Sequence, residues 1–228
     1  MDRAAAGVSE AMRPAPDTYA PPPDDALPVV HLDEHMIVLD KPSGLLSVPG
    51  KGEALADCLE ARVQARHPNA LTVHRLDRDT SGLVVMAMSP QAQRHLGLQF
   101  ERRKLAKTYI AIVSGVIAAD DGEIDLPLIA DWPNRPLQKV CHETGKPALT
   151  RWRVLERTAG ATRVQLEPHT GRSHQLRVHM RELGHSILGD PLYGDAESAP
   201  RLMLHAHTLE LHHPADGVRL KLEAPVPF

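Results

Sequence analysis

The sequence predicts an α+β domain, in which helices flank a mixed, largely antiparallel central sheet. Short apolar segments that fit strands outnumber those that fit helices, and many neighbouring strands are separated only by short turns. Such an order is typical of the α+β class. Hydrophobic residues make up 42% of the 228 residues and aromatic residues only 3%, so a sizeable and mainly aliphatic core is expected.

The N-terminal segment differs in composition from the rest of the chain. Residues 1–27 are rich in alanine and proline, and we expect them to form a disordered tail because they cannot bury enough apolar surface to offset their ordering entropy. Residues 28–228 are expected to form one folded domain. Residues 1–28 carry a net charge of −3, equal to that of the whole chain, so the remaining residues are formally neutral.

The first half of the domain is expected to contain short strands and one helix. Strands are expected at 29–31 and 36–39, on either side of a polar turn, and proline and glycine indicate a loop at 41–44. Apolar residues at four-residue spacing predict an amphipathic helix at about 54–66. The continuous apolar run at 83–88 is typical of a buried strand.

The second half begins with a helix start signal. Ser89 is a good N-cap and Pro90 fits the first helical position. A helix is also expected at about 174–183, closed by Gly184. Alternation and turn residues predict the remaining strands at 108–113, near 123–129, 148–156 and 162–167, and at 203–211 and 218–222.

The segment 74–82, His-Arg-Leu-Asp-Arg-Asp-Thr-Ser-Gly, is the most informative for function. A charged loop here leads directly into a buried strand, so a carboxylate such as Asp77 could be held rigidly beside a cleft. The plainer interpretation is a turn in which Asp77 or Asp79 caps backbone N–H groups. The residues from Asp77 onward do not make a calcium-binding loop. Such a loop needs a bidentate glutamate at its twelfth position, which here is Met88.

Two further segments carry candidate site residues. On the helix predicted at about 174–183, Leu176 and Met180 face the core, while Arg177 lies one turn from His174 on another row. Arg177 could pair with a carboxylate through two hydrogen bonds, or could simply lie on a solvated basic face. Tyr109 lies on the strand predicted at 108–113, and it could be a catalytic or an ordinary core tyrosine.

The sequence shows no metal or cofactor motif. Among its 14 histidines there is no His-Glu-x-x-His pattern, and only His205 and His207, which alternate on a strand, could share a face. No glycine-rich phosphate loop or dinucleotide fingerprint is present. No apolar run approaches a membrane span, and two cysteines do not make a disulfide framework, so a cytoplasmic protein is expected.

Several of these segments together resemble the RluA family of pseudouridine synthases. The run at 74–82 is similar to the catalytic motif of the family, and Lys-Pro-Ser-Gly at 41–44, Lys-x-Tyr at 107–109 and Gly-Arg-Ser-His-Gln-Leu-Arg at 171–177 match other motifs in the same order. The Leu-Gly-Asp-Pro-Leu-Tyr-Gly stretch within 185–194 matches the loop that follows. The resemblance covers residues 29–228 and implies a catalytic domain with a central RNA-binding cleft.

The resemblance implies roles for individual residues. Asp77 would start glycosidic cleavage, Tyr109 would pack on the uracil, and Arg177 would pair with Asp77. Arg75 would fill the gap left by a flipped base. Basic residues expected to bind RNA are the cluster Arg102, Arg103 and Lys104, together with Arg172.

The resemblance also implies a substrate. The stretch 125–147 is similar to the branch of the family that acts on uridine 746 of 23S rRNA and on uridine 32 of the tRNA anticodon loop. The partner is then RNA, with no cofactor, no metal, no membrane and no obligatory protein partner. Residues 1–27 are too short for the S4 RNA-binding domain of some relatives, so the catalytic domain itself would bind RNA.

Two other functions are possible from the residues alone. A non-catalytic RNA-binding module would not need Asp77, and a carboxylate among basic residues repels phosphate. A hydrolase with Asp77 and Asp79 as a carboxylate pair would need them on opposite sides of a glycosidic bond, which neighbours on one loop cannot reach. Hydrolysis adds water to the RNA, whereas isomerisation leaves its mass unchanged.

Overall fold

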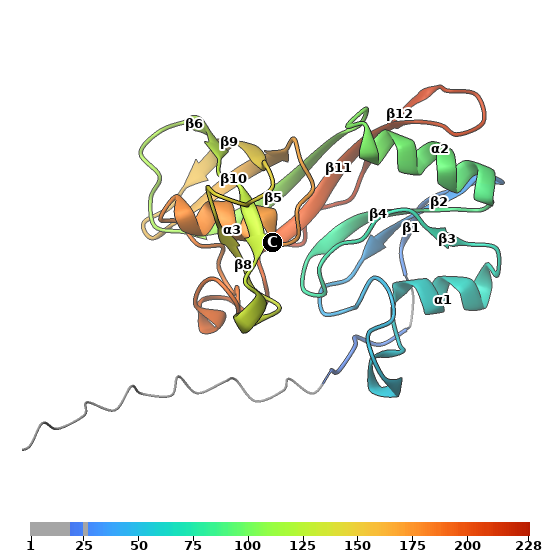
Figure 1. The fold of residues 1–228 in the computed structure, drawn as a ribbon, viewed down its shortest axis with the longest axis horizontal. Coiled ribbons are helices and arrows are strands. Elements are labelled where there is room, and N and C mark those ends of the chain that lie inside the picture. Colours follow the sequence, from blue (N-terminus) through green and yellow to red (C-terminus); the bar gives the residue numbers. More distant parts are fainter. Residues whose placement is uncertain (1–18, 25–26) are drawn as a thin grey trace, which may run out of the picture.

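The computed structural model describes residues 19–24 and 27–228, and in this part of the chain ten strands form one mixed sheet. The strands run in the order β1-β2-β4-β11-β5-β10-β9-β6, with β12 paired to β11 and β3 paired to β4. Every pairing is antiparallel except that of β11 with β4. The α+β class with a largely antiparallel central sheet is therefore confirmed. Figure 1 shows the sheet bending into two halves, joined by β5 and β11.

The bounds of the elements are as follows. The strands are β1 (Val29–Leu32), β2 (Met36–Lys41), β3 (Leu71–Thr72), β4 (Ser81–Ala87), β5 (Ala106–Ser114), β6 (Asp121–Asp125), β7 (Leu128–Ala130), β8 (Gln138–Val140), β9 (Leu149–Arg157), β10 (Ala161–Pro168), β11 (Leu204–His212) and β12 (Arg219–Glu223). The helices are α1 (Leu59–Arg66), α2 (Pro90–Glu101) and α3 (Gln175–Glu182), with short 3-10 turns at Glu53–Leu55, Trp132–Asn134 and Ala196–Ser198.

The first half of the molecule is a sheet covered by helices on both faces. All seven residues of β4 are buried, and successive residues point to opposite faces. Val84 and Met86 pack with Leu59 of α1, whereas Leu83 and Val85 pack with Leu96 of α2. The continuous apolar run that predicts a buried strand is explained by this double cover.

The second half is formed by β5, β10, β9 and β6, with α3 packed on one face. Leu176 and Met180 of α3 enter a core cluster with Val164 and Leu166 of β10, as the helical spacing predicts. All six residues from 175 to 180 are nevertheless buried, so Arg177 is not on a solvated face, although Arg181, one turn later, is exposed. The small sheet of β7 and β8 packs beside α3, where Leu128 and Val140 join a cluster with Val178.

Strand β11 joins the two halves because it lies between β4 and β5. Its parallel pairing with β4 aligns His205 with Ser81 and Ala206 with Gly82. Gly82 has a φ of +111°, and a Cβ atom there would lie 2.3 Å from the carbonyl oxygen of Ala206. Only glycine permits this close approach, which brings the loop 74–80 to the junction of the two halves.

The local sequence signals are mostly confirmed, with differences at the termini of elements. Ser89 caps α2 as predicted, and its Oγ accepts a hydrogen bond from the N–H of Ala92. The helix expected at 54–66 begins only at Leu59, because Cys58 has extended backbone angles and serves as the N-cap. Strands β3 and β8 were not predicted, since segments of two and three residues are too short to show alternation.

The expected tail at 1–27 lies largely outside the described residues. The part that is described, residues 19–24, contacts the folded domain. The hydroxyl of Tyr19 donates to the carbonyl of Asp57, and Arg62 of α1 donates to the carbonyl oxygens of Pro22 and Pro23. These contacts hold residues 19–24 against α1, because backbone carbonyls of a proline-rich segment are good acceptors for a buried arginine. None of the helices in the described part of the chain has the length and apolar character of a membrane span.

Candidate active site

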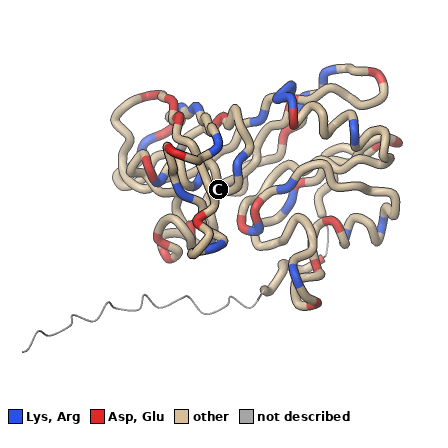
Figure 2. Tube along the Cα trace, viewed as in Figure 1, with Lys and Arg blue, Asp and Glu red and all other residues tan. Residues whose placement is uncertain are grey.

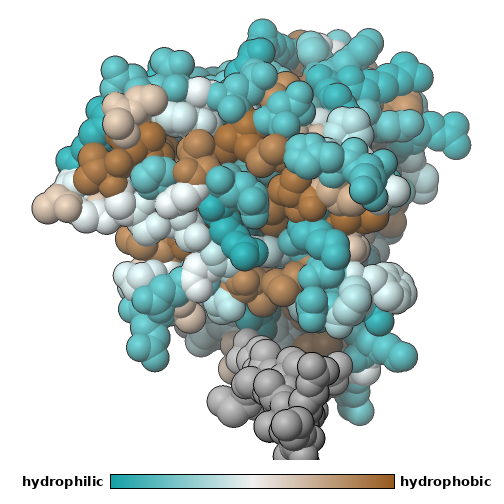
Figure 3. Space-filling view, turned by 60° about the vertical axis from the view of Figure 1, so that its left-hand side comes forward, coloured by the Kyte–Doolittle hydropathy of each residue, from teal (hydrophilic) through white to brown (hydrophobic). Residues whose placement is uncertain are grey.

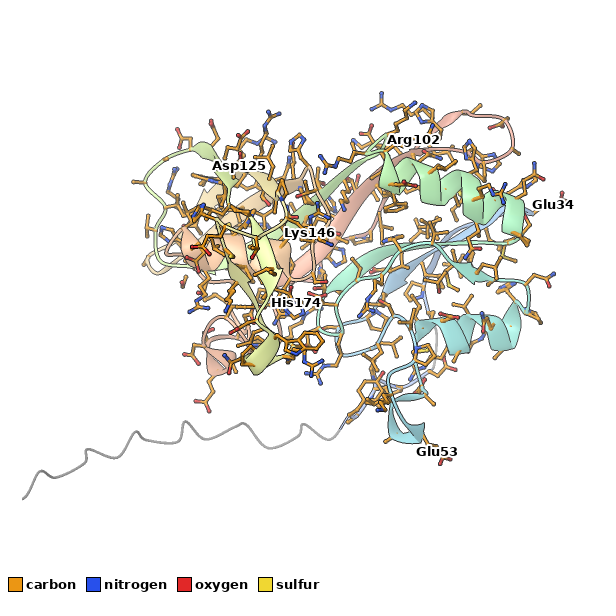
Figure 4. The ribbon with its side chains drawn as sticks, in the orientation of Figure 1. Glu34, Glu53, Arg102, Asp125, Lys146 and His174 are labelled. Carbon is orange, nitrogen blue, oxygen red and sulfur yellow. The ribbon has the colours of Figure 1, made fainter. Side chains whose placement is uncertain are left out.

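A cleft of about 1020 Å³ lies where the two halves of the sheet meet. Its walls come from the loop 74–80, the C-terminal turn of α2, the start of β5, the end of β10 and the first turns of α3. Candidate residues from three separate motifs line it, namely Arg75, Asp77, Tyr109, Arg172 and Arg177. Figure 4 shows His174, a further lining residue, between the two halves of the molecule.

The loop that carries Asp77 is held in place by the loop after β2. Lys41 is fully buried, and its Nζ donates to three carbonyl oxygens: those of Pro42 and Leu45 in its own loop and that of Arg78 at 2.9 Å. The hydroxyls of Ser43 and Ser47 donate to the carbonyls of Asp79 and Leu76. The Lys-Pro-Ser-Gly motif at 41–44 and Ser47 thus hold the backbone on either side of Asp77 by hydrogen bonds.

The charge state of Lys41 follows from this geometry. Burial lowers the pKa of Lys41 to about 7. Three carbonyl acceptors at 2.7–2.9 Å nevertheless match the three N–H donors of an ammonium group. A neutral amine has only two donors, so the arrangement favours the charged form.

Asp77 lies at the wall of the cleft with its carboxylate accessible. Its side chain is 27% exposed, and its Oδ2 lies 3.4 Å from Nη1 of Arg177 and 3.9 Å from Nε2 of His174. Its carbonyl accepts a hydrogen bond from the N–H of Thr80, which closes the turn. The side chain therefore does not cap the turn, and the plainer interpretation of this aspartate is excluded.

Arg177 is buried, and its principal partner is Asp190 rather than Asp77. Its Nε and Nη2 donate to the two oxygens of Asp190 at 2.8 and 2.7 Å, and the carboxylate of Asp190 is fully buried. Burial alone would lower the pKa of Arg177, but the hydrogen bonds and charge of Asp190 raise it above its ordinary value. The predicted pairing of Arg177 with Asp77 occurs as a single long hydrogen bond, and the bidentate geometry expected for it belongs to Asp190.

The start of α3 is fixed by a second chain of contacts. His174 has a left-handed φ of 53° and ends the loop before the helix. Its Nδ1 lies 2.7 Å from the hydroxyl of Tyr193, which also accepts a hydrogen bond from the N–H of Gln138 in β8. Burial lowers the pKa of His174, although the negative charge of Asp77 acts to raise it. Tyr193 therefore orients His174 beside Asp77.

Tyr109 lies on β5 at the floor of the cleft, partly exposed to it. Burial, and then the charge of Asp77, raise the pKa of Tyr109 well above its ordinary value. The phenol is therefore protonated at neutral pH. Tyr109 lines the cleft together with Asp77, and its hydroxyl is a neutral hydrogen-bond donor.

The edge of the cleft next to Tyr109 holds a neutral histidine and a lysine. His74 stacks on Phe100 of α2, with ring centroids 4.3 Å apart, and its Nε2 accepts the N–H of Val85. Burial and the nearby Lys107 lower the pKa of His74 to about 3. Burial also lowers the pKa of Lys107, which lines the cleft. His74 is thus a structural anchor for the loop and not a titrating group.

The predicted RNA-binding residues divide into two groups. Arg75, Arg103 and Arg172 line the cleft, whereas Arg102 and Lys104 do not. The turn after α2, where Arg102 lies, is at the outer rim of the cleft (Figure 4).

Sequence reasoning missed Asp190 and Lys107 as site residues, although both lie inside motifs that were singled out. Asp190 is part of Leu-Gly-Asp-Pro-Leu-Tyr-Gly, and a buried aspartate there is the partner that a buried arginine requires.

The arrangement can support nucleophilic or general-base chemistry at a carboxylate. Asp77 is accessible, a charged guanidinium lies beside it, and a neutral phenol lies at the floor of the same cleft. Asp79, the other carboxylate of the motif, is ion-paired with Arg78 and does not line the cleft. A hydrolytic pair made of Asp77 and Asp79 is therefore excluded by placement.

Comparison with known proteins gives, along most of the chain, the family that the sequence motifs resemble. A sequence model of the family described as RNA pseudouridylate synthase matches residues 35–182. A protein of Escherichia coli K12, called dual-specificity RNA pseudouridine synthase RluA, is 51% identical over 216 residues, which cover 93% of this chain and 99% of that relative. The protein of the same name from Yersinia pestis is 52% identical over 204 residues, covering 88% of this chain and 99% of the relative.

Two solved structures have a similar fold. The human RNA pseudouridylate synthase domain containing 1 superposes with a TM-score of 0.77 at 29% identity, covering 92% of this chain and 87% of that chain. The human RNA pseudouridylate synthase domain containing 4 gives a TM-score of 0.70 at 26% identity, with 88% of each chain covered.

Proposed function

The chain belongs to the RNA pseudouridylate synthase family, and from this membership we propose that Asp77 is the carboxylate that starts the reaction. The enzyme is an isomerase that converts uridine in RNA to pseudouridine. The proposal for Asp77 rests on one observation: an accessible carboxylate at the wall of the cleft, beside a buried arginine that is itself fixed by Asp190.

The proposed substrates are a ribosomal RNA and a tRNA. Relatives at 49–52% identity, matched along nearly their whole length, are called dual-specificity RNA pseudouridine synthases. The targets that the resemblance implies are uridine 746 of 23S rRNA and uridine 32 of the tRNA anticodon loop. We propose that the enzyme acts on these RNAs in the cytoplasm without an obligatory protein partner.

The chemistry assigns a distinct task to each residue. The bond between N1 of uracil and C1′ of ribose breaks, the base turns, a bond forms between C5 and C1′, and C5 loses its proton while N1 gains one. Asp77 starts this by attack on the sugar, by attack on the base or by removal of the proton at C2′, and all three routes require its carboxylate to be unprotonated and accessible. No atom or electron is gained overall, so the isomerisation itself needs no redox cofactor.

The target base has to leave its stack to reach Asp77. Extrusion of a base costs a few kcal/mol, and Arg75, which is exposed at the rim of the cleft, is placed to occupy the gap that the base leaves. The ring of Tyr109 provides the apolar surface on which the uracil packs. Arg103 and Arg172 then contact the RNA backbone at the rim.

An exposed aromatic residue outside the lining of the cleft offers a further surface for RNA. Trp132, in the turn between β7 and β8, is 68% exposed, and the guanidinium of Arg135 lies 3.8 Å from the centre of its ring. Exposed aromatic rings and arginine planes are surfaces on which unpaired bases stack. Figure 3 shows that hydrophilic side chains surround small apolar patches on the face that this half of the molecule presents.

The proposal is tested with Asp77→Asn and with Asp79→Asn as a matched control on the same loop. The substrate is an anticodon stem-loop labelled with tritium at C5 of the target uridine, and the release of tritium reports the isomerisation. Asp77→Asn is expected to fold normally, to bind the stem-loop and to release no tritium above background, whereas Asp79→Asn retains turnover.

Two outcomes would contradict the proposal. Substantial turnover by well-folded Asp77→Asn would remove Asp77 from its role. A gain in RNA mass equal to one water molecule would show hydrolysis instead of isomerisation. Mapping of pseudouridines in total RNA from cells with and without the protein identifies the target uridines.

A further inference from the structure

Three side chains of types that can bind transition metals lie close together at the far end of the first half of the molecule. His31 belongs to β1, Asp33 to the turn between β1 and β2, and His213 to the residues after β11. One ligand atom of each lies within 4.8 Å of the others. None of the three lines the catalytic cleft. Glu34, the neighbour of Asp33, marks the position in Figure 4, at the edge of the molecule away from His174.

Both imidazoles contact the same oxygen of Asp33. Nε2 of His31 lies 2.5 Å from Oδ2 of Asp33, and Nε2 of His213 lies 3.0 Å from the same oxygen. In a tetrahedral zinc site with bonds of about 2.0–2.1 Å, ligand atoms are roughly 3.3 Å apart. A shift of less than about 1 Å would therefore admit an ion between the three atoms.

Both aspartate oxygens have separate tasks. Oδ1 of Asp33 accepts the backbone N–H groups of His35 and Met36, at 2.7 and 2.9 Å, and so fixes the turn. Oδ2 is left for the two imidazoles. The carboxylate is thereby oriented as a monodentate ligand before any ion binds.

A second carboxylate lies behind His213. Its Nδ1 is 3.2 Å from Oδ1 of Asp216, while its Nε2 faces the cluster. A histidine that binds a metal through one ring nitrogen commonly donates its other N–H to a carboxylate, which fixes the tautomer and raises the basicity of the ligand nitrogen. The carboxylate of Asp216 lies within reach of such an N–H, although in this structure Nδ1 also accepts the backbone N–H of Ala215 at 3.4 Å.

We propose that His31, Asp33 and His213 form a binding site for a divalent transition-metal ion, Zn²⁺ by donor type, that connects the β1–β2 turn to the end of β11. Two imidazole nitrogens and one carboxylate oxygen suit zinc, whereas magnesium and calcium prefer oxygen ligands. Three protein ligands leave a fourth position for water. The side chains are 13–30% exposed, so an ion can reach them from solvent. The site is separate from the isomerisation.

The test measures metal binding to the full-length protein. The protein is first treated with a chelator to remove bound metals, and the chelator is then removed. Zinc binding is followed by calorimetry, and Co²⁺ binding by its visible absorption. Wild type is expected to bind one Zn²⁺ per chain and not to bind Mg²⁺ at the site. His213→Gln is expected to lose at least 100-fold in zinc affinity and to lose the Co²⁺ absorption band.

Two further variants separate a metal ligand from a fold contact. Asp216→Asn changes a residue whose side chain is 60% exposed, so it folds, and it is expected to lower zinc affinity about 10- to 100-fold. His95→Gln removes an exposed histidine of α2 that is outside the cluster, and it should bind zinc as wild type does.

Either of two results would overturn the site. Wild type with no saturable zinc binding would show that the cluster is an ion pair only. Equal zinc affinity in wild type, His213→Gln and Asp216→Asn would place the metal elsewhere. Turnover of the metal-free enzyme on the stem-loop is expected to equal that of the zinc-bound enzyme, so failure of this proposal leaves the proposal for Asp77 intact.

Discussion

Arg177 contacts two carboxylates unequally, and this inequality defines the site at the scale of single residues. Asp190 is buried and takes two short hydrogen bonds, while Asp77 is partly exposed and takes one long one. Asp190 therefore neutralises and orients the guanidinium, and Asp77 stays free to react in a positive field. The buried N–H groups of Leu192 and Tyr193 also donate to Asp190, which fixes it in turn.

Arg177→Lys is expected to lower both turnover and stability. A lysine retains the charge but cannot donate to both oxygens of Asp190 and to Asp77 in one plane. We expect kcat to fall at least 100-fold and the free energy of unfolding in urea to fall by about 1–3 kcal/mol. Asp190→Asn leaves the arginine without its countercharge and should lower the free energy of unfolding by about 3–5 kcal/mol.

Arg181→Lys is the matched control, because Arg181 is exposed on the same helix. Near-normal turnover by Arg177→Lys would contradict the assigned role. So would a shallower salt dependence of RNA binding in that variant, since such a change is the mark of a contact to phosphate.

Tyr109→Phe is expected to change kcat far more than KM. The ring that packs on the uracil is retained, but the hydroxyl, which the raised pKa keeps protonated, is lost. We expect kcat to fall about 100-fold or more, as for the loss of a group that assists proton transfer. Steady-state kinetics of tritium release measures both constants, and Tyr19→Phe, outside the cleft, is the control. An unchanged kcat would reduce Tyr109 to a packing residue.

At the scale of elements, a buried lysine connects two loops that carry separate motifs. The end of β2 and the loop after it contribute Lys41, Ser43 and Ser47, and each donates to a backbone carbonyl of residues 76–79. The N–H of Gly44 donates to the carbonyl of Arg78 as well. The catalytic loop therefore depends on a segment that contributes no side chain to the chemistry.

Lys41→Met is expected to destabilise the protein and to inactivate it. Three buried carbonyls lose their donor at once, and each such loss costs about 1–3 kcal/mol. We expect the free energy of unfolding in urea to fall by roughly 3 kcal/mol or more, with turnover falling because the loop of Asp77 loosens. Lys51→Met changes an exposed lysine and should alter neither quantity. A stable, active Lys41→Met enzyme would show that the hydrogen bonds of Lys41 do not hold the loop of Asp77 in place.

At the scale of the whole molecule, charge distribution matters more than net charge. The chain carries a formal charge of −3, yet arginines from three separate segments, Arg75, Arg103 and Arg172, line one cleft. Figure 2 shows basic and acidic positions interspersed along the trace, with basic positions gathered at the turn after α2. A weakly charged body with a basic rim gives local attraction for phosphate.

Arg103→Ala is expected to weaken binding of the stem-loop and to lower its salt dependence. The loss of one phosphate contact should reduce the slope of log K against log salt by roughly 0.7–0.9. Salt titrations of binding for Arg103→Ala, Arg102→Ala and wild type measure this, and we expect Arg102→Ala to have the smaller effect because it does not line the cleft. Arg94→Ala, on the exposed face of α2, is the control. An unchanged slope for Arg103→Ala would show that the RNA follows another path.

The sequence by itself determined most of the elements and singled out the carboxylate that we propose reacts. Hydrophobic spacing located the strands and helices, Ser89 marked the start of α2, and the passage from a charged loop into β4 singled out Asp77. These features are local, because periodicity and capping depend on residues a few positions apart.

Only the tertiary structure decided which residues meet. Arg177 and Asp77 are 100 positions apart, and His213 and Asp33 are 180 positions apart. The insertion of β11 between β4 and β5 brings the first pair together, and Asp190 then takes the two strong hydrogen bonds that were expected for Asp77. A sequence pattern shows which side chains a segment offers, but their partners are set by packing between distant segments, where burial makes an unpaired charge too costly to keep.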